Sequence, residues 1–326
     1  MPPAAEGGAL TFSIVIPTYQ GVDSICDTVR SISALRCSDR TELIVVVDGS
    51  TDATTSKLAA VECRIPLRII EQPNRGLAAA RNRGAGEATG AILLFLDDDM
   101  ICLPDLLERH ARAFRDGADA VVGAFTEAGS PIAGLTYAEG AIRNFEPPSK
   151  SVSAFDIYGG HFAVRRDVFE QLGGFDVSFT QEGNYGCEDR DFGLRLLETF
   201  VVVGNPNAVC RHEKQISPID YLRRARQSAR SEARLLAKHP EVRDEMIRWS
   251  GAANRSKRLR LLSQVPIVPQ IVAGCVGVAV TAAARTPLRR SRGVERLCHA
   301  AYAWSYWSSV YREGALPELW GRNAVC

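Results

Sequence analysis

Short runs of Ile, Val and Leu alternate with longer stretches of mixed polarity along the first half of the chain. The short runs lack the alternation of a strand with one wet face, which predicts strands buried on both faces. These strands are predicted at residues 12–16, 43–47, 67–70, 92–96 and 120–122. Helices are predicted between them at residues 23–35, 52–61, 77–87 and 104–114. Such alternation indicates the α/β class, with a mostly parallel sheet flanked by helices.

The pattern becomes irregular between residues 125 and 155, where Gly, Pro and Ser predict loops. Regular structure is expected again after residue 158. The elements predicted there are a helix from Asp167 that Gly173-Gly174 ends, a helix from Glu188, a strand-like run at 201–203 and a helix over 217–238.

Composition and charge divide the chain into two parts. Its 326 residues are 46% apolar and 24% charged, which excludes disordered and fibrous classes. Residues 1–210 carry 18 Lys/Arg and 29 Asp/Glu, whereas residues 211–326 carry 21 and 9. The front is therefore acidic, with a net charge of −11, and the back is basic, with +12. We expect an α/β domain over 1–215 and a helical, basic and apolar region over 216–326.

Polar residues follow three of the predicted strands. In open α/β sheets, ligands bind in the crevice beyond the carboxyl ends of the strands. The residues after the first, second and fourth strands are Pro17-Thr18-Tyr19, Asp48 and Asp97-Asp98-Asp99. We expect all of them at one edge of the sheet.

The three adjacent aspartates suggest a cation. Their carboxylates repel one another, and a divalent cation such as Mg²⁺ or Mn²⁺ relieves that repulsion. A solvated strand end with helix-capping aspartates is the other interpretation. Asp48 has two interpretations as well, a contact to the ribose or base of a nucleotide or the first residue of a turn.

A series of short segments over residues 12–215 extends this pattern. They are Ile14-Val15-Ile16-Pro17-Thr18-Tyr19, Val45-Val46-Val47-Asp48-Gly49-Ser50-Thr51-Asp52, Asn74-Arg75-Gly76, Ala80-Arg81-Asn82, Asp97-Asp98-Asp99, Gly159-Gly160-His161, Gly173-Gly174-Phe175-Asp176 and Glu188-Asp189-Arg190-Asp191. In order and spacing the chain resembles the family 2 glycosyltransferases with the GT-A fold. The resemblance implies an inverting transferase whose donor is a nucleotide sugar, most often a UDP-sugar.

The resemblance also implies roles for residues on the donor side. Pro17, Thr18 and Tyr19 would line the base pocket, and Asp48 would bind the uracil or ribose. Either Arg75 or Arg81 would lie near the pyrophosphate. Asp97 and Asp98 would bind the substrate, with Asp98 on the ribose. Asp99 and His212 would bind the Mn²⁺ or Mg²⁺.

Inversion by a single displacement needs one carboxylate to take the acceptor proton. Asp189 would be that base by resemblance, with Glu188 as the alternative beside it. Gly159-Gly160 suggests close backbone approach to a ligand or a tight turn. His161 would touch the acceptor or simply pack.

The basic part suggests contact with anionic lipid. Arginines recur every three or four residues along the predicted helix at 217–238, beside a narrow apolar stripe. Residues 265–284 carry no charge and are long enough to span a bilayer. We expect a helical hairpin there that enters or lies on the membrane rather than a true crossing, and a buried core helix is the other interpretation. Tyr and Trp residues that suit a membrane interface follow at 302–311. We expect a glycan or lipid-linked acceptor and a cytoplasmic protein at the inner face of the membrane, with no nucleic-acid partner.

Other functions fit the pattern less well. A nucleotidyltransferase shares the sheet and metal aspartates, but it would need a Gly-rich phosphate loop where Pro17-Thr18-Tyr19 stands. A non-catalytic module would not need Glu188-Asp189. A dehydrogenase is disfavoured because no GxGxxG follows the first strand. The nine cysteines include no CxxC pair, which fits a reducing compartment. The first ten residues lack the features of a signal peptide.

Overall fold

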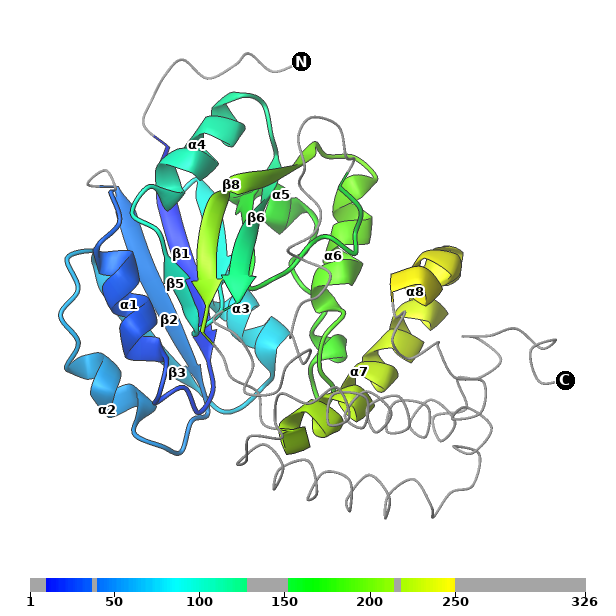
Figure 1. Cartoon of the computed structure of the whole chain (residues 1–326), viewed down its shortest axis with the longest axis horizontal. Helices are drawn as coiled ribbons and strands as arrows, with labels where there is room; N and C mark the ends of the chain where they lie inside the picture. The colour runs from blue at the N-terminus through cyan, green and yellow to red at the C-terminus, as the bar shows by residue number, and fades with distance from the viewer. Residues whose placement is uncertain (1–9, 37–39, 128–151, 214–217, 250–326) are drawn as a thin grey trace, which may run out of the picture. The chain divides into compact units, whose positions relative to one another are not determined.

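The structure is a computed structural model that describes residues 10–36, 40–127, 152–213 and 218–249. The chain divides into two compact units. Figure 1 labels the described helices and strands along the chain. The first contains Met1–Thr126, Ala141–Val177 and Asp189–Glu213, and the second contains Glu127–Gly140, Ser178–Glu188 and Lys214–Cys326. The apolar stretch at 265–284 and the aromatic stretch at 302–311 lie outside the described residues.

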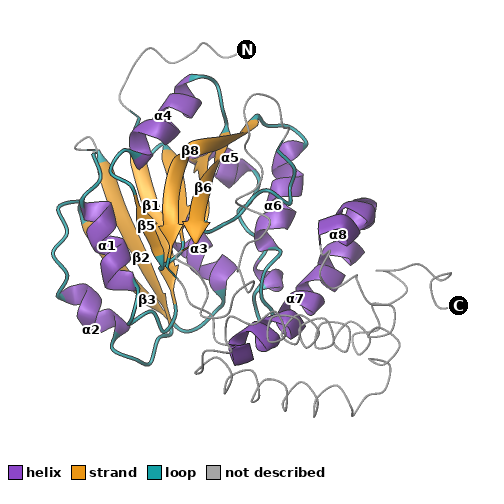
Figure 2. Cartoon of the chain, viewed as in Figure 1, coloured by secondary structure: helices purple, strands orange, loops and turns teal. Residues whose placement is uncertain are grey.

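The first unit is built on a sheet whose eight described strands run in the order β3-β2-β1-β4-β7-β6-β8-β5. Figure 2 shows the strands of this sheet in orange and the helices in purple. The strands are β1 Phe12–Thr18, β2 Thr41–Asp48, β3 Leu67–Gln72, β4 Ile92–Leu96, β5 Met100–Cys102, β6 Ala120–Glu127, β7 His161–Arg165 and β8 Val202–His212. Strands β1 to β4 are mutually parallel neighbours, as their apolar runs predicted. The α/β class is confirmed.

The other half of the sheet is antiparallel, which corrects the expectation of a mostly parallel sheet. Strand β7 pairs antiparallel with both β4 and β6, and β5 pairs antiparallel with β8. The run at 120–122 reads like a parallel strand because both of its faces are buried. Burial on both faces makes a run apolar whichever way the strand points.

The predicted helices of the first unit all form, and where a residue was predicted as a helix end the observed end differs by at most two residues. They are α1 Ile25–Ser33, α2 Thr54–Ala59, α3 Leu77–Gly86, α4 Leu106–Arg115, α5 Arg166–Gln171 and α6 Glu188–Leu197. Helix α5 ends before Gly173 and Gly174, whose φ angles of 74° and 71° few other residues would adopt. This confirms the predicted glycine stop.

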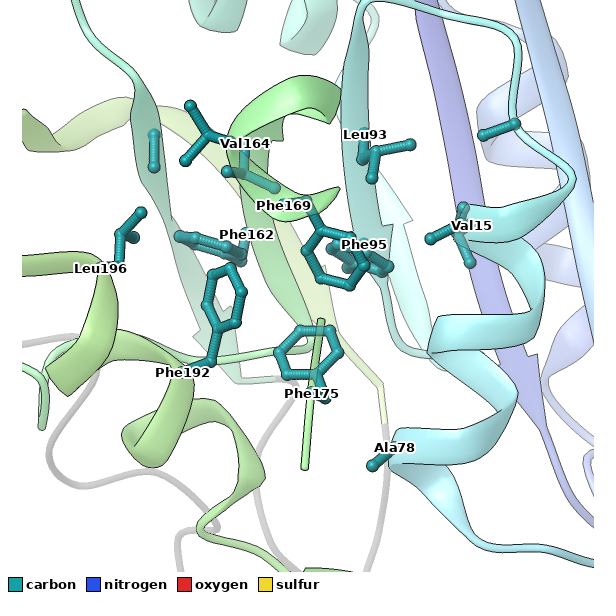
Figure 3. Close-up of a cluster of buried hydrophobic side chains, with 14 of the residues drawn as sticks. Val15, Ala78, Leu93, Phe95, Phe162, Val164, Phe169, Phe175, Phe192 and Leu196 are labelled. Carbon is teal, nitrogen blue, oxygen red and sulfur yellow. The ribbon is translucent and has the colours of Figure 1, made fainter. Parts of the chain in front are cut away.

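Helices α3, α5 and α6 contribute side chains to one hydrophobic core on one face of the sheet. Its centre is an aromatic cluster of five rings (Figure 3). The rings belong to Phe95 on β4, Phe162 on β7, Phe169 on α5, Phe175, and Phe192 on α6. Their contacting centroids lie 5.1 to 5.9 Å apart. Each buried ring contributes about 1.5–3 kcal/mol, and the contact of Phe192 with Phe162 holds α6 against β7.

The second unit contains the long helix α7, Pro218–Lys238, which agrees with the helix predicted at 217–238. The short helices η2, Pro240–Val242, and α8, Arg243–Trp249, follow it, and η1, Val177–Phe179, begins just before Ser178–Glu188. Ser178–Glu188 belongs to this unit although the sequence pattern placed it in the first domain. The reason is that Ser231 and Gln227 of α7 donate hydrogen bonds to the carbonyls of Phe179 and Gly183.

The exposed side of α7 is basic. Its buried stripe comprises Ala225, Ala229, Ala233, Leu235 and Leu236. Arg223, Arg230 and Arg234 are exposed. Among the helices that the structure describes, none is both long and apolar enough to span a bilayer.

Candidate functional site

The strand ends that carry polar residues meet at one edge of the sheet. Strands β2, β1 and β4 are neighbours and parallel, so Asp48, Thr18 and Asp97 all stand at carboxyl ends. The hydroxyl of Thr18 donates to Asp98 Oδ2 at 2.6 Å. The structure therefore joins the residues after β1 directly to the aspartate run after β4.

Asp98 is held from two sides. Besides the Thr18 bond to its carboxylate, its backbone carbonyl accepts a hydrogen bond of 2.9 Å from Thr28 of α1. Gly21 comes so close that a Cβ there would lie 2.5 Å from Asp98 Oδ2. Neighbouring Pro17 is buried and Tyr19 is 55% exposed. Tyr19 thus presents an aromatic ring at the edge.

Asp48 holds the loop that leads into α3. Its Oδ1 accepts hydrogen bonds from Gln72 Nε2 at 2.7 Å and from the backbone N–H of Arg75 at 2.8 Å. Its Oδ2 accepts one from the N–H of Gly76 at 2.9 Å. Asp48 is buried, and the Arg75 side chain is exposed. That Asp48 contacts a nucleotide stays a prediction. Its hydrogen bonds show that it also stabilises the loop before α3.

Asp97 has both carboxylate oxygens engaged inside the protein. Arg81 Nη2 donates to Oδ1 at 2.8 Å, and the hydroxyl of Tyr158 donates to Oδ2 at 2.7 Å. The Arg81 side chain is 2% exposed and lies over the ring of Phe175. Of the two arginines predicted near a pyrophosphate, Arg81 faces Asp97 and Arg75 faces outward.

Residues 158–161 form a tight turn between Asp97 and Asp189. His161 N–H donates to the Tyr158 carbonyl at 3.0 Å, and Asp97 N–H donates to the Gly160 carbonyl at 3.1 Å. Gly159 N–H donates to Asp189 Oδ2 at 3.2 Å. A Cβ on Gly160 would lie 2.4 Å from Asp97 Oδ2. The close approach predicted for these glycines is thus made to protein side chains.

Asp189 and Glu188 begin helix α6 but differ in exposure. Asp189 is half-buried, and its Oδ1 accepts a hydrogen bond of 2.8 Å from the Arg190 N–H. Glu188 is 2% exposed. Asp191 is fully buried and paired with Arg195 at 2.9 Å. Asp189 is therefore the more accessible of the two carboxylates that the sequence offered as a base.

Asp99 and His212 face each other. His212 Nε2 lies 3.3 Å from Asp99 Oδ1, and both side chains are buried. The antiparallel pairing of Met100 with His212 creates this contact. A cation with octahedral bonds of about 2.1 Å holds neighbouring donors roughly 3 Å apart, so this spacing suits two ligands of one ion. Among the described residues, this pair included, no group of three or more His, Cys, Asp or Glu is arranged to hold a metal ion.

His161 does not join these residues. Its ring is fully buried on the side of α4, where Nδ1 donates to the Ala124 carbonyl at 2.9 Å. Its Nε2 lies 3.1 Å from His110 Nε2 and 3.9 Å from the Cys210 thiol. Burial lowers the pKa of His161 to about 4 and the pKa of His110 well below its ordinary value. Of its two predicted tasks, packing is the one this geometry supports.

Sequence reasoning missed two residues. The sequence pattern predicts no role for Tyr158, although its place before a Gly-Gly pair indicates a turn. His110 occupies the apolar face of α4 beside Leu106, Leu107, Ala111 and Phe114. A histidine at such a position signals a buried partner, but nothing local says which one.

Comparisons with known proteins show which sequences and folds this chain resembles. The model of glycosyl transferase family 2 matches residues 13–173, and that of the N-terminal domain of galactosyltransferase matches residues 141–217. The uncharacterized glycosyltransferase YfnE of Bacillus subtilis is 35% identical over 113 residues, which are 34% of this chain and 28% of that protein. The dolichol-phosphate mannosyltransferase of Pyrococcus furiosus is 23% identical over 74% of this chain and 65% of its own length.

Two solved structures share the fold. The mannosyltransferase PcManGT of Pyrobaculum calidifontis, in complex with GDP-Man and Mn²⁺, has a TM-score of 0.56 at 19% identity, over 97% of this chain and 88% of that one. TarS 1-349 of S. aureus, in complex with UDP-GlcNAc, has a TM-score of 0.55 at 18% identity, over 94% and 92%. Residues 13–173 belong to glycosyltransferase family 2, and the chain has the GT-A fold. It spans less than two thirds of the length of the two curated relatives named above.

Proposed function

We propose that this protein transfers a sugar from a nucleoside diphosphate sugar to an acceptor hydroxyl, with inversion at the sugar carbon. The observation that carries the proposal is the turn at 158–161. It links the aspartate run, through Asp97, to the half-buried carboxylate of Asp189. One side of this turn suits the diphosphate of a donor, and the other suits an acceptor hydroxyl that must lose its proton.

The donor side consists of the residues at the ends of β1, β2 and β4. The exposed ring of Tyr19 can stack on a base, with Pro17 and Thr18 beneath it and Asp48 on the uracil or ribose. Asp98 binds the ribose in this proposal, and exposed Arg75 serves the pyrophosphate. TarS was solved with UDP-GlcNAc and PcManGT with GDP-Man, and the aspartate at the end of β2 makes a UDP-sugar our choice.

Asp99 and His212 are the proposed metal ligands. One carboxylate oxygen and one imidazole nitrogen at 3.3 Å fit a cation such as Mn²⁺, which accepts both donor types. Bound there, the cation would stabilise the negative charge that grows on the departing diphosphate. Both ligands are buried, and the β5–β8 pairing fixes their spacing before a donor arrives.

Asp189 is the proposed base. An inverting displacement uses no enzyme nucleophile. One carboxylate that takes the proton from the hydroxyl of the acceptor is therefore sufficient. The hydrogen bonds from Gly159 N–H and Arg190 N–H aim the Asp189 carboxylate and leave it half-buried. Buried Glu188 is the less suitable of the pair.

A lipid-linked acceptor is the second part of the proposal. A relative named for transfer to dolichol phosphate supports it. The exposed arginines of α7 suit anionic headgroups, since each basic residue near such a surface contributes about 1 kcal/mol. We place the protein at the inner face of the membrane, in the cytoplasm.

A hydrolysis screen tests the reaction. The protein is incubated with UDP- and GDP-sugars plus Mn²⁺ or Mg²⁺, and release of the nucleoside diphosphate is measured. We expect release from one UDP-sugar and loss of release with EDTA. A nucleotidyltransferase would instead form pyrophosphate from a nucleoside triphosphate and a sugar phosphate, and that result would replace our proposal.

A further inference from the structure

Tyr158 occupies a central place among the residues of the site. Its hydroxyl reaches Asp97, and its backbone carbonyl closes the turn whose Gly159 N–H reaches Asp189. We infer that Tyr158 is a positioning residue, which holds the aspartate run and the base in one fixed arrangement. This inference rests on the proposed transfer reaction and adds to it a residue that does not itself touch the reacting atoms.

Both carboxylate oxygens of Asp97 accept hydrogen bonds from side chains. With Arg81 on Oδ1 and Tyr158 on Oδ2, its carboxylate is held by side chains from two separate segments. Arg81 is fixed in turn by its buried position over the ring of Phe175. The orientation of Asp97 is thus set from α3 on one side. Tyr158 then ties the 158–161 turn to that fixed point.

The turn at 158–161 contacts both Asp97 and Asp189. Asp97 N–H donates to the Gly160 carbonyl, so the turn is joined to Asp97 through backbone as well as through the tyrosine hydroxyl. The same turn donates Gly159 N–H to the carboxylate of Asp189 at 3.2 Å. A shift of the turn therefore moves a hydrogen-bond donor of the base relative to the aspartate run.

The ring of Tyr158 packs against another aromatic ring. It lies 5.1 Å from the ring of Phe125, which in turn lies 5.8 Å from the imidazole of His212. The ring is therefore held by packing, independently of the hydroxyl. Replacement of Tyr158 by Phe removes one hydrogen bond and keeps this packing, so the two contributions can be separated.

These contacts predict an effect on turnover rather than on donor binding. A base must be held within about 0.5 Å of its productive position, and a misplacement of about 1 Å can cost roughly 100-fold in rate. Donor affinity depends on groups at the ends of β1, β2 and β4. Of these, Tyr158 contacts Asp97, and Asp97 keeps its hydrogen bond to Arg81 when the tyrosine hydroxyl is removed.

The experiment compares Tyr158→Phe with wild type in the donor-hydrolysis assay. We expect kcat to fall by about 10- to 100-fold while the calorimetric Kd for the UDP-sugar changes by less than about threefold. Gly160→Ala is a second variant, because its Cβ would press on Asp97 Oδ2 and the Tyr158 ring at 2.4 Å. It should lower kcat in the same way.

Ser13→Ala is the matched control. The Ser13 hydroxyl donates to Glu42 Oε1 at 2.6 Å, a similar bond to a carboxylate at the amino end of β1. It should lower the thermal midpoint without changing kcat. An unchanged kcat in Tyr158→Phe, a parallel loss of donor affinity, or an equal loss of kcat in Ser13→Ala would overturn the inference. A wild-type protein that releases no nucleoside diphosphate would refute the proposed function itself.

Discussion

Two histidines of the same sheet, His212 and His161, ended up in opposite kinds of surroundings. His212 faces the carboxylate of Asp99 at the edge where the strand-end aspartates gather. His161 faces the buried His110 ring, the carbonyl of Ala124 and the buried Cys210 thiol. We call Asp48, Asp97, Asp98, Asp99 and Asp189 the acidic rim, and His110 with His161 the buried histidine pair.

Strand register accounts for the difference. Phe162 points into the aromatic cluster, so its neighbour His161 must point to the opposite face, where α4 lies. His212 is the last residue of β8 and pairs with Met100, which follows Asp99 directly. Two residues of one type thus acquire different chemistry from the face and the strand end they occupy. The acidic rim should therefore govern activity, and the buried pair should govern stability.

The strongest test of this contrast is Asp189→Asn. Loss of the base should lower kcat by about 10³-fold, within the range that general base catalysis contributes. Donor affinity should stay within about threefold, because the donor is bound elsewhere. Nucleoside diphosphate release and calorimetry measure the two quantities. Asp167→Asn, at an exposed position on α5, is the control and should behave as wild type. Surviving turnover in Asp189→Asn would remove the base assignment.

The two histidines give a second test. His212→Gln should raise the Mn²⁺ concentration for half-maximal activity by more than about tenfold, since even outer-shell partners of a metal contribute about that much. His161→Gln should leave the Mn²⁺ dependence unchanged and lower the free energy of unfolding by about 1–3 kcal/mol, because buried hydrogen-bonding atoms lose their partners. Mn²⁺ titrations and denaturant unfolding measure these effects. Equal Mn²⁺ curves for wild type and His212→Gln would contradict the metal role.

Acid should affect the buried histidine pair within a defined range. Burial lowers the pKa of His161 to about 4 from an ordinary 6.5, so the unfolded chain binds more protons between these values. The free energy of unfolding therefore has its full value, as far as His161 is concerned, above pH 6.5. It decreases as the pH falls toward 4, by up to about 3 kcal/mol. Denaturant unfolding between pH 7 and pH 4 measures the loss. The free energy of unfolding of His161→Gln should decrease less over this pH range than that of the wild type. An equal decrease in the two proteins would show that groups other than His161 cause the acid sensitivity.

The smallest effect is expected on the outer side of α4. Arg109 and Asp105 form an exposed i,i+4 pair at 2.7 Å above the buried histidine pair. Such pairs contribute less than about 1 kcal/mol. Arg109→Ala should shift the thermal midpoint by less than about 4 °C and leave nucleoside diphosphate release unchanged. A larger shift would show that α4 depends on its surface charges rather than on its buried face.

Much of the site could be predicted from short segments. Asp48 and Asp97 to Asp99 follow apolar runs directly, and parallel neighbours must bring their carboxyl ends to one edge. The sequence also predicted that a helix starts at Glu188. What these segments could not provide was the partner of each side chain. Nothing near Arg81 in the sequence indicates that it faces Asp97, or that Tyr158 would occupy the other oxygen.

The sequence by itself determined the apolar strands, the helices between them, the family and the rim of aspartates, because burial and periodicity are local properties of a chain. Only the tertiary structure decided that half the sheet is antiparallel, that β8 returns beside β5 and brings His212 to Asp99, and that His161 turns away. Those outcomes depend on which strands become neighbours and in which direction. That choice follows from the packing of segments far apart in the chain.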